Sequence, residues 1–320
     1  MKLFLGIDTS AYTSSISVVD QDFNVIFDKR LPLKVEDGKR GLRQSQALFL
    51  HLQNLPLLFR ELSSFSPNDI CAAAVSAFPC RKPGSYMPVF SAGNTVAQVL
   101  SAYNNLMLYQ VSHQEGHIMA GILDNRKLLA SKEFLAVHFS GGTSDIMLVK
   151  RCKSHFLSIT PLMSSSDLYP GQLVDRIGVA MGLPFPAGKE MEKLAITVDP
   201  KAVPVIPSAV KKDSFSFSGL ETRARQLMQK GMAHNSIAFS IFRSIANTLE
   251  KSLAKQAEEW GIKDILLVGG VMANSLIRSR LVHRLEHPAV GLKLHFASPR
   301  LSTDNAVGVA MMAACLYQLE

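Results

Sequence analysis

The chain has 320 residues, of which 47% are hydrophobic and 19% are charged. This length fits two domains or one two-lobed unit, and the apolar content supports sizeable cores and argues against disorder. The formal net charge of +8 favours polyanionic partners such as RNA, or anionic substrates such as nucleotides.

The four cysteines, Cys71, Cys80, Cys152 and Cys315, form no C-x-x-C pair. Their spacing argues against a disulfide framework or a structural zinc knuckle and is typical of free thiols in a reducing cytosol. The N-terminal stretch becomes polar too soon for a secretory signal, and no run of 18 uncharged apolar residues follows it. We therefore expect a soluble cytoplasmic protein with no membrane segment.

The sequence patterns predict strands that alternate with helices along the chain. In the first half the patterns predict strands at 2–7, 16–20, 23–33, 70–77 and 106–112, and helices at 41–62, 91–107 and 113–123. In the second half they predict strands at 134–139, 146–150, 264–268 and 292–297, and helices at 172–182, 219–231, 236–260, 273–285 and from Asp304 to 319. Pro56 is expected to end or kink the helix in which it lies.

Both halves open in the same way, with an apolar strand, a small polar turn and a second strand. This occurs at residues 2–20, as a predicted β-hairpin, and again at 134–150. The faint internal repeat and the alternation of strands with helices predict an α/β protein with two similar halves.

His113 and His117 are four residues apart in a predicted helix, so their side chains share one face. Two neutral imidazoles at this spacing can bind one Zn²⁺ or Fe²⁺ ion. Unrelated surface or core histidines show the same spacing. The HExxH pattern of zinc proteases is absent, because Glu115 stands in the middle of the pair.

Two glycine-rich turns are suited to nucleotide binding. In Ser140-Gly141-Gly142-Thr143-Ser144, between two strands, backbone N–H groups and hydroxyls can bind phosphate oxygens. Gly269-Gly270 follows a buried strand and leads through Asn274 into a helix. The alternatives are a plain hairpin turn and a helix start capped by small residues.

Acidic residues supply further candidate ligands. Asp304 precedes the last helix, where it could cap the helix or bind a metal ion. Asp175 lies on a predicted helix, and Glu192 begins another after a Pro/Gly loop that contains Gly188. Carboxylates in this setting can bind ribose hydroxyls, and they can equally be solvated surface acids.

The order of these motifs is more specific than any one of them. HxxxH, SGG, an aspartate followed by PxG, Phe215-Ser216-Phe217-Ser218-Gly219, GGVxAN and TDN succeed one another along the chain. With this order the sequence resembles, nearly end to end, the TsaD family (also called Gcp, Kae, OSGEP and YgjD). These are tRNA threonylcarbamoyladenosine synthesis proteins that were once labelled O-sialoglycoprotein endopeptidases.

The resemblance implies the two-lobed fold of actin, Hsp70 and sugar kinases (the ASKHA fold), with a nucleotide and a metal ion in the cleft between the lobes. We expect residues 1–127 with 305–320 to form the N-terminal lobe and 128–304 to form the C-terminal lobe. The implied reaction transfers a threonylcarbamoyl group from threonylcarbamoyl-AMP to N6 of adenosine 37 in tRNA. The implied ligands are one iron or zinc ion and ATP or threonylcarbamoyl-AMP, and the implied partners are tRNA and other proteins of the threonylcarbamoyladenosine pathway.

By position in the motifs, the resemblance implies that His113, His117 and Asp304 bind the metal. His138 stands where archaeal members have a tyrosine ligand, so it is a fourth candidate. The implied substrate- and nucleotide-binding residues are Phe139, Ser140, Gly141, Gly142, Asp175, Gly188, Glu192, Gly270 and Asn274. Among these, the 138–142 loop would hold the phosphate and acyl part, Asp175, Gly188 and Glu192 the ribose, and Asn274 the adenine.

The chain departs from the family pattern on the substrate side. Thr143 replaces a histidine or asparagine, Gln172 replaces a glutamate, and Glu221 replaces a basic residue. The turn at 8–14 lacks two acids of the family, and residues 76–93 replace a short Gly-Pro-Gly loop.

These departures leave alternatives open. One is a divergent paralogue that binds nucleotide and metal and regulates or scaffolds a modification complex, or carbamoylates another acceptor. A small-molecule kinase of the same fold is another, because Asp145 could serve as its catalytic aspartate. The old glycoprotease label has no support in the motifs.

Overall fold

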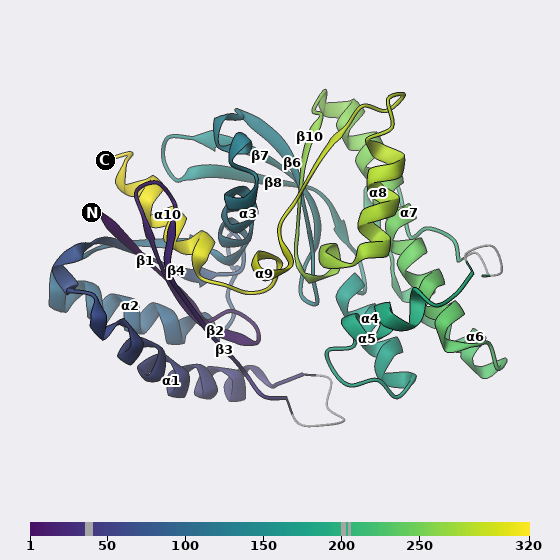
Figure 1. The fold of residues 1–320 in the computed structure, drawn as a ribbon, viewed down its shortest axis with the longest axis horizontal. Coiled ribbons are helices and arrows are strands. Elements are labelled where there is room, and N and C mark those ends of the chain that lie inside the picture. Colours follow the sequence, from purple (N-terminus) through teal and green to yellow (C-terminus); the bar gives the residue numbers. More distant parts are fainter. Residues whose placement is uncertain (36–40, 200–202, 204–205) are drawn as a thin grey trace.

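The computed structural model describes residues 1–35, 41–199, 203 and 206–320, and it contains two mixed β-sheets with helices on their faces (Figure 1). The strands of the first sheet are β1 (Leu3–Asp8), β2 (Thr13–Asp20), β3 (Val25–Pro32), β4 (Ile70–Phe78) and β5 (Met107–Ser112), in the order β3-β2-β1-β4-β5. β1, β2 and β3 form an antiparallel meander, while β4 and β5 extend the sheet parallel to β1.

The second sheet repeats this arrangement. Its strands are β6 (Glu133–Phe139), β7 (Ser144–Cys152), β8 (Phe156–Ser165), β9 (Ser214–Phe215), β10 (Asp264–Val268) and β11 (Lys293–Phe296), in the order β11-β10-β6-β7-β8-β9. β6, β7 and β8 form an antiparallel meander, and β10 and β11 extend the sheet parallel to β6. The internal repeat expected from the sequence is therefore confirmed, and it includes the parallel strands as well as the opening hairpin.

The helices and sheets form alternating layers (Figure 1). The helices are α1 (Gln44–Glu61), α2 (Phe90–Asn104), α3 (His113–Asp124), α4 (Pro170–Ala180), α5 (Gly188–Ala195), α6 (Ser218–Gln229), α7 (His234–Trp260), α8 (Ser275–Leu285), α9 (Pro299–Ser302) and α10 (Val307–Tyr317). α1 and α2 cover the outer face of the first sheet, and α7 and α8 cover the outer face of the second. α3 and α10 lie in the core between the two sheets. None of the helices within the described ranges is long and apolar enough to cross a membrane.

α10 and α3 pass each other at very close range. A Cβ atom added to Gly308 on α10 would lie 1.9 Å from the carbonyl oxygen of Gly116 on α3. Only glycine at position 308 allows this approach, because any side chain would collide with backbone. The crossing fixes α3, the helix that carries both candidate histidine ligands, against the C-terminal helix.

Three features differ from the sequence expectations. α5 begins at Gly188, so Gly188 is helical and Glu192 lies within the helix rather than at its start. α1 runs unbroken from Gln44 to Glu61, so Pro56 does not end it. Leu55 and Leu58, both 1% exposed, bury their side chains on either side of Pro56, and we attribute the continuity of the helix to this packing. β8 was not expected, because Pro161 and several serines interrupt its apolar pattern. The lobe boundaries proposed above stay a proposal, which the packing of α10 on the first sheet supports.

Candidate functional site

The start of α3 positions the two candidate histidine ligands. Ser112 caps the helix: its hydroxyl accepts a hydrogen bond from the Glu115 amide (3.1 Å), and the Glu115 carboxylate accepts one from the Ser112 amide (2.6 Å). His113 is therefore the first helical residue, and His117 lies one turn later. Their Nε2 atoms are 3.0 Å apart, so the two imidazoles face the same point.

Asp304 reaches that point from the loop between α9 and α10. Its Oδ1 atom lies 3.7 Å from Nε2 of His113 and 3.5 Å from Nε2 of His117. One donor atom from each of the three residues lies within 4.8 Å of the others. The structure thus brings together three residues that the sequence analysis grouped as metal ligands.

His138, the fourth candidate ligand, lies at the end of β6 beside this group. Its ring centroid is 4.3 Å from that of His117 and 6.2 Å from that of His113. It is 1% exposed, and neither of its ring nitrogens has a hydrogen-bond partner among the described residues. The three ligand atoms that lie close together come from His113, His117 and Asp304. His138 lies beside them as a buried imidazole whose nitrogens are unused within the described part of the chain.

Asp8 is a member of the site that the sequence analysis missed. It ends β1, is fully buried, and places Oδ2 3.6 Å from Nδ1 of His113. The Ser10 hydroxyl donates to the same oxygen at 2.7 Å, and the Ser10 amide donates to Oδ1 at 3.2 Å. A carboxylate on the far nitrogen of an imidazole orients the ring and leaves the other nitrogen for a ligand. The signal available in the sequence was an aspartate directly after a buried strand.

The buried charges shift the pKa values of the cluster in opposite directions. Burial alone would lower the pKa of His113, but the nearby Asp8 carboxylate outweighs it and raises that pKa. Burial likewise would raise the pKa of Asp8, and the neighbouring His113 holds it below the ordinary value. Burial, reinforced by His113, lowers the pKa of His117, and burial holds that of His138 well below its usual range. Two of the three imidazoles are thus kept neutral, the form that binds metal ions.

The donor set fits a divalent transition metal. Two imidazole nitrogens and a carboxylate oxygen converge on one point, as in three-ligand zinc and non-haem iron sites that keep positions open for substrate. The buried Nδ1 of His117 and the two nitrogens of His138 lack partners within the part of the chain that the structure describes. This chemistry suits Zn²⁺ or Fe²⁺ better than Mg²⁺ or Ca²⁺, which prefer oxygen ligands.

The Ser140-Gly141-Gly142 turn joins β6 to β7 next to His138. The Ser140 hydroxyl accepts hydrogen bonds from the amides of Gly142 (3.2 Å) and Thr143 (3.0 Å). Two amides of the turn therefore already bond to the serine hydroxyl, and a phosphate oxygen would have to share them with the serine or replace it. A Cβ atom on Gly171 would lie 2.6 Å from the Gly141 nitrogen, so α4 approaches this turn as closely as a glycine permits.

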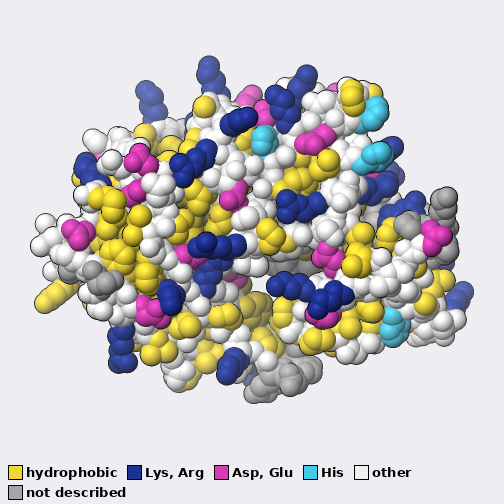
Figure 2. All heavy atoms as spheres, in the orientation of Figure 1, with side chains coloured by type: hydrophobic (Ala, Val, Ile, Leu, Met, Phe, Trp, Pro, Cys, Tyr) yellow, Lys and Arg dark blue, Asp and Glu magenta, His cyan; other side chains and the backbone are white. Residues whose placement is uncertain are grey.

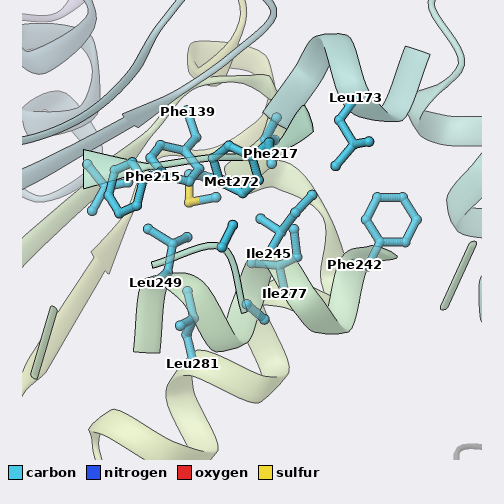
Figure 3. Close-up of a cluster of buried hydrophobic side chains, with 14 of the residues drawn as sticks. Phe139, Leu173, Phe215, Phe217, Phe242, Ile245, Leu249, Met272, Ile277 and Leu281 are labelled. Atoms are coloured by element: carbon cyan, nitrogen blue, oxygen red, sulfur yellow. The ribbon is translucent and has the colours of Figure 1, made fainter. Parts of the chain in front are cut away.

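Phe139 belongs to the core rather than to the surface of the cleft. It is fully buried, and its ring packs on Phe215 and Phe217, with centroids 5.4 and 6.0 Å away (Figure 3). Met272, which follows the Gly269-Gly270 turn, joins the same cluster (Figure 3). The side chain of Phe139 is thus not available to a ligand and instead packs beneath the Ser140-Gly141-Gly142 turn.

The predicted ribose and adenine residues form a chain of contacts between α4, α5 and α8. The Asp175 carboxylate accepts a hydrogen bond from the Ala187 amide at 2.8 Å, directly before Gly188. Burial raises the pKa of Asp175. Glu192 accepts a hydrogen bond from the Ser275 amide at 2.7 Å. Asn274, next to Ser275, caps α8 by accepting from the Ile277 amide at 3.0 Å.

These contacts give Asp175, Glu192 and Asn274 a structural partner each. The Asn274 oxygen is used in capping, which leaves its amide nitrogen for a base. Gly188 and Gly270 have no atom within 4 Å of an added Cβ, so the backbone there is open to a ligand. The structure therefore brings Asp175, Gly188, Glu192 and Asn274 into one connected region, and their role in nucleotide binding stays a prediction.

Asp167 is a second residue that the sequence analysis missed. Its carboxylate accepts hydrogen bonds from the Ser216 hydroxyl (2.7 Å), the Phe217 amide (2.9 Å) and the Ser218 hydroxyl. Burial would raise its pKa, but these hydrogen bonds, led by the Ser218 hydroxyl, lower it to about 2. Asp167 thereby fixes the Phe-Ser-Phe-Ser motif to the loop before α4.

Solved structures of other proteins share the fold of this chain. Full-length HypF in a phosphate- and nucleotide-bound form matches with a TM-score of 0.64 at 12% identity, over 98% of this chain and 46% of that one. A ROK family glucokinase from Streptomyces griseus, in complex with glucose and AMPPNP, matches with a TM-score of 0.54 at 11% identity, over 97% and 99%. At these identities the likeness establishes the fold alone, which is the two-lobed ASKHA fold expected from the sequence.

Curated sequences give a closer relationship. A tRNA N6-adenosine threonylcarbamoyltransferase from Carboxydothermus hydrogenoformans is 30% identical over 322 residues, which cover 99% of this chain and 92% of that protein. One from Riemerella anatipestifer is 26% identical over 329 residues, covering 99% and 93%. The family model described as TsaD, tRNA N6-adenosine threonylcarbamoyltransferase, matches residues 41–311. The match over most of the chain shows that this protein belongs to the TsaD family of transferases.

Proposed function

We propose that this protein transfers a threonylcarbamoyl group from threonylcarbamoyl-AMP to N6 of adenosine 37 in tRNA. The observation that carries the proposal is the convergence of His113, His117 and Asp304 within a chain of the TsaD family. These three residues would hold one divalent iron or zinc ion, with His138 beside them as a further candidate ligand. The reaction would take place in the cytoplasm, with other proteins of the threonylcarbamoyladenosine pathway as partners.

A bound divalent ion supplies a Lewis acid that polarises an acyl or phosphoryl oxygen. Asp8 would orient His113 by facing its Nδ1–H group as an acceptor, which leaves Nε2 free as a ligand. The N–H groups of the Ser140-Gly141-Gly142 turn would bind the phosphate of the leaving AMP. No covalent nucleophile is needed, because the N6 amine of the acceptor attacks the carbamoyl carbon directly.

The nucleotide half of the substrate would lie along α4, α5 and α8. Asp175, Gly188 and Glu192 would face the ribose, and the side-chain nitrogen of Asn274 would face the adenine. The hydrogen bonds of Asp175 to Ala187 and of Glu192 to Ser275 support this placement, because they fix both carboxylates in one region. The positive net charge of the chain supports a tRNA acceptor.

A second candidate is a divergent family member that binds nucleotide and metal but regulates a modification complex or uses another acceptor. It is favoured by the turn at Ser140, where the amides of Gly142 and Thr143 already bond to the serine hydroxyl. It is also favoured by Thr143 and Gln172, which replace the residues typical of the family.

The two candidates are separated by one assay. The purified chain, with and without its partner proteins, is incubated with threonylcarbamoyl-AMP and unmodified tRNA, and the nucleosides are analysed by mass spectrometry. We expect threonylcarbamoyladenosine as product. Absence of product under every partner condition, with metal and nucleotide still bound, would refute the transferase and leave the second candidate.

The metal site is tested independently by the double variant His113→Ala/His117→Ala. The chain offers a matched control, because His283 and His287 are also four residues apart but are both exposed. We expect about one metal ion per chain, by elemental analysis, in the unaltered protein and in His283→Ala/His287→Ala, and almost none in the first variant. Equal metal content in all three proteins would refute the site.

A further inference from the structure

The loop between β4 and α2 forms a hollow at the surface. Residues Phe78 and Cys80–Tyr86 line an open hollow of about 310 Å³, at the lower end of the range for small-molecule sites. That volume suits a single nucleotide or a short side-chain group rather than an extended protein segment. This loop lies within the segment that departs from the TsaD pattern, and none of the roles proposed above involves it.

Both ends of the loop are attached to the candidate metal centre. The Pro79 carbonyl accepts a hydrogen bond at 3.1 Å from the amide of Gln114, the residue after His113. At the other end, the Val89 carbonyl accepts a hydrogen bond at 3.0 Å from the hydroxyl of Thr9, the residue after Asp8. The Phe90 ring, one residue on, lies 6.1 Å from the His113 ring. The loop that forms the hollow is therefore attached, at both of its ends, to residues adjacent to His113 and Asp8.

Internal contacts hold the loop in one conformation. The Cys80 amide donates to the Ser85 hydroxyl at 3.1 Å, and the Ser85 amide donates to the Lys82 carbonyl at 3.1 Å. Arg81 pairs at 3.2 Å with Glu115, which is 1% exposed. The charge of Arg81 is thus used to attach the loop to α3, and the hollow is formed before any ligand arrives.

Lys82 and Tyr86 are left facing solvent at the rim of the hollow. The Tyr86 side chain is 68% exposed. Lys82 is exposed and forms none of the salt bridges among the described residues; its charge acts on the Asp145 carboxyl, whose pKa burial raises and Lys82 lowers. A cation beside an exposed aromatic ring is the pairing that binds single-stranded nucleic acid, with the ring stacking on a base and the cation contacting a phosphate. Separately from this hollow, Figure 2 shows Lys and Arg side chains on both sides of the gap between the two halves of the molecule.

We propose that the Phe78–Tyr86 loop binds a single-stranded RNA nucleotide that flanks the reacting adenosine, with Tyr86 stacked on its base and Lys82 paired with its phosphate. This inference rests on the proposed function in one respect, namely that the acceptor is an RNA. An acidic protein segment would use Lys82, but it would gain nothing from an aromatic ring turned to solvent, so RNA is the occupant that accounts for both side chains.

The test is direct RNA binding by the full chain. A fluorescent RNA hairpin with an unmodified adenosine in its single-stranded loop is titrated by anisotropy at several KCl concentrations. Tyr86→Ala should bind roughly 5- to 150-fold more weakly, and Tyr86→Phe should bind like the unaltered protein because it keeps the ring. Lys82→Ala should reduce the salt slope of log K by about 0.7, the value for one phosphate contact on a single strand.

Two exposed residues on other elements provide matched controls. Tyr103, 89% exposed at the end of α2, and Lys230, exposed after α6, should tolerate alanine with no change in affinity or salt slope. If the Tyr86 and Lys82 variants bind RNA as these controls do, or if the unaltered chain binds no RNA, the proposal is wrong. Stronger competition by poly-glutamate than by the unlabelled hairpin would also overturn it, in favour of an acidic protein segment.

The same variants separate this proposal from the proposed function. RNA binding that depends on Tyr86, without any threonylcarbamoyl transfer, would refute the transferase and leave the loop assignment standing. Transfer by Tyr86→Ala with unchanged KM for tRNA would refute the loop assignment and leave the transferase standing.

Discussion

The ring of His138 lies against that of His117, with centroids 4.3 Å apart, and both nitrogens of His138 are buried without a partner among the described residues. A buried polar group without a hydrogen bond costs about 1–3 kcal/mol. A ligand bound beside His117 would remove this cost if it contacted the His138 nitrogens, either directly or through a water molecule.

We predict that His138→Phe weakens zinc binding roughly 10- to 100-fold, the range found when a group that supports a metal ligand is lost. The metal-free variant should be at least as stable as the unaltered protein, because the substitution removes two unsatisfied nitrogens. Competition titration with a zinc chelator and urea unfolding in EDTA measure the two effects. Unchanged zinc affinity would exclude His138 from the site.

The hydrogen bonds to Asp167 predict a pH dependence. Since its pKa is lowered to about 2 from the ordinary 3.8, Asp167 contributes stability that is fully present above pH 3.8 and is lost as the pH falls towards 2. We predict that Asp167→Asn is less stable than the unaltered protein at pH 6 and that the difference narrows below pH 4. Urea unfolding between pH 6 and pH 3 checks this. Asp213, an exposed aspartate, supplies the control as Asp213→Asn, and a difference from the unaltered protein that stays constant down to pH 3 would contradict the assignment.

The grouping of His113, His117 and Asp304 was predictable from sequence because the spacing of the histidines and the order of the motifs both constrain it. His113 and His117 share a helix, so local geometry alone places them on one face. The two sheets were largely predictable for a similar reason, since their buried strands are short, uninterrupted apolar runs.

The contributions of Asp8 and Asp167 were not predictable in this way, because each depends on contacts between segments far apart in the chain. Asp8 acts by its contact with His113 on α3, and Asp167 acts by its hydrogen bonds with Ser216 and Ser218. β8 was not predicted because Pro161 interrupts the alternation of apolar and polar residues along it. Where stability comes from partners distant in sequence, local patterns carry no signal.

The close crossing of α3 and α10 predicts that position 308 tolerates only glycine. Gly308→Ala would place a Cβ 1.9 Å from the Gly116 carbonyl oxygen, so the two helices would have to separate. We predict a loss of about 1–3 kcal/mol in the free energy of unfolding, together with weaker zinc binding as α3 moves. Chemical denaturation and zinc titration measure both effects.

Gly219 on α6 supplies the matched control for this helix substitution. A Cβ atom there meets nothing within 4 Å, so Gly219→Ala should leave stability unchanged or raise it by about 0.4–1 kcal/mol. Equal changes in the free energy of unfolding for Gly308→Ala and Gly219→Ala would show that α3 and α10 are not in the close contact described.

Arg300 connects the loop that carries Asp304 to the first sheet. On α9, four residues before Asp304, it donates a hydrogen bond to Asp28 on β3 at 2.7 Å, and Arg30 donates to the Arg300 carbonyl at 2.6 Å. Asp28 is 5% exposed; burial would raise its pKa, but hydrogen bonds from Arg30 and Arg300 keep that pKa below the ordinary value. The contacts between Arg300 and Asp28 therefore join α9 to the first sheet. We infer that they position Asp304.

We predict that Arg300→Ala weakens zinc binding roughly 2- to 30-fold, the effect expected of a residue that acts on a site through intervening contacts. The fold should be retained, because the buried Asp28 carboxylate keeps its ion pair with Arg30 at 2.8 Å when the largely exposed Arg300 side chain is removed. Arg284, 55% exposed and paired with Glu250 at 2.8 Å, is the matched control, and Arg284→Ala should bind zinc like the unaltered protein. If both arginine variants retain full affinity, Asp304 is held by its own loop and the connection to Asp28 has no part in the site.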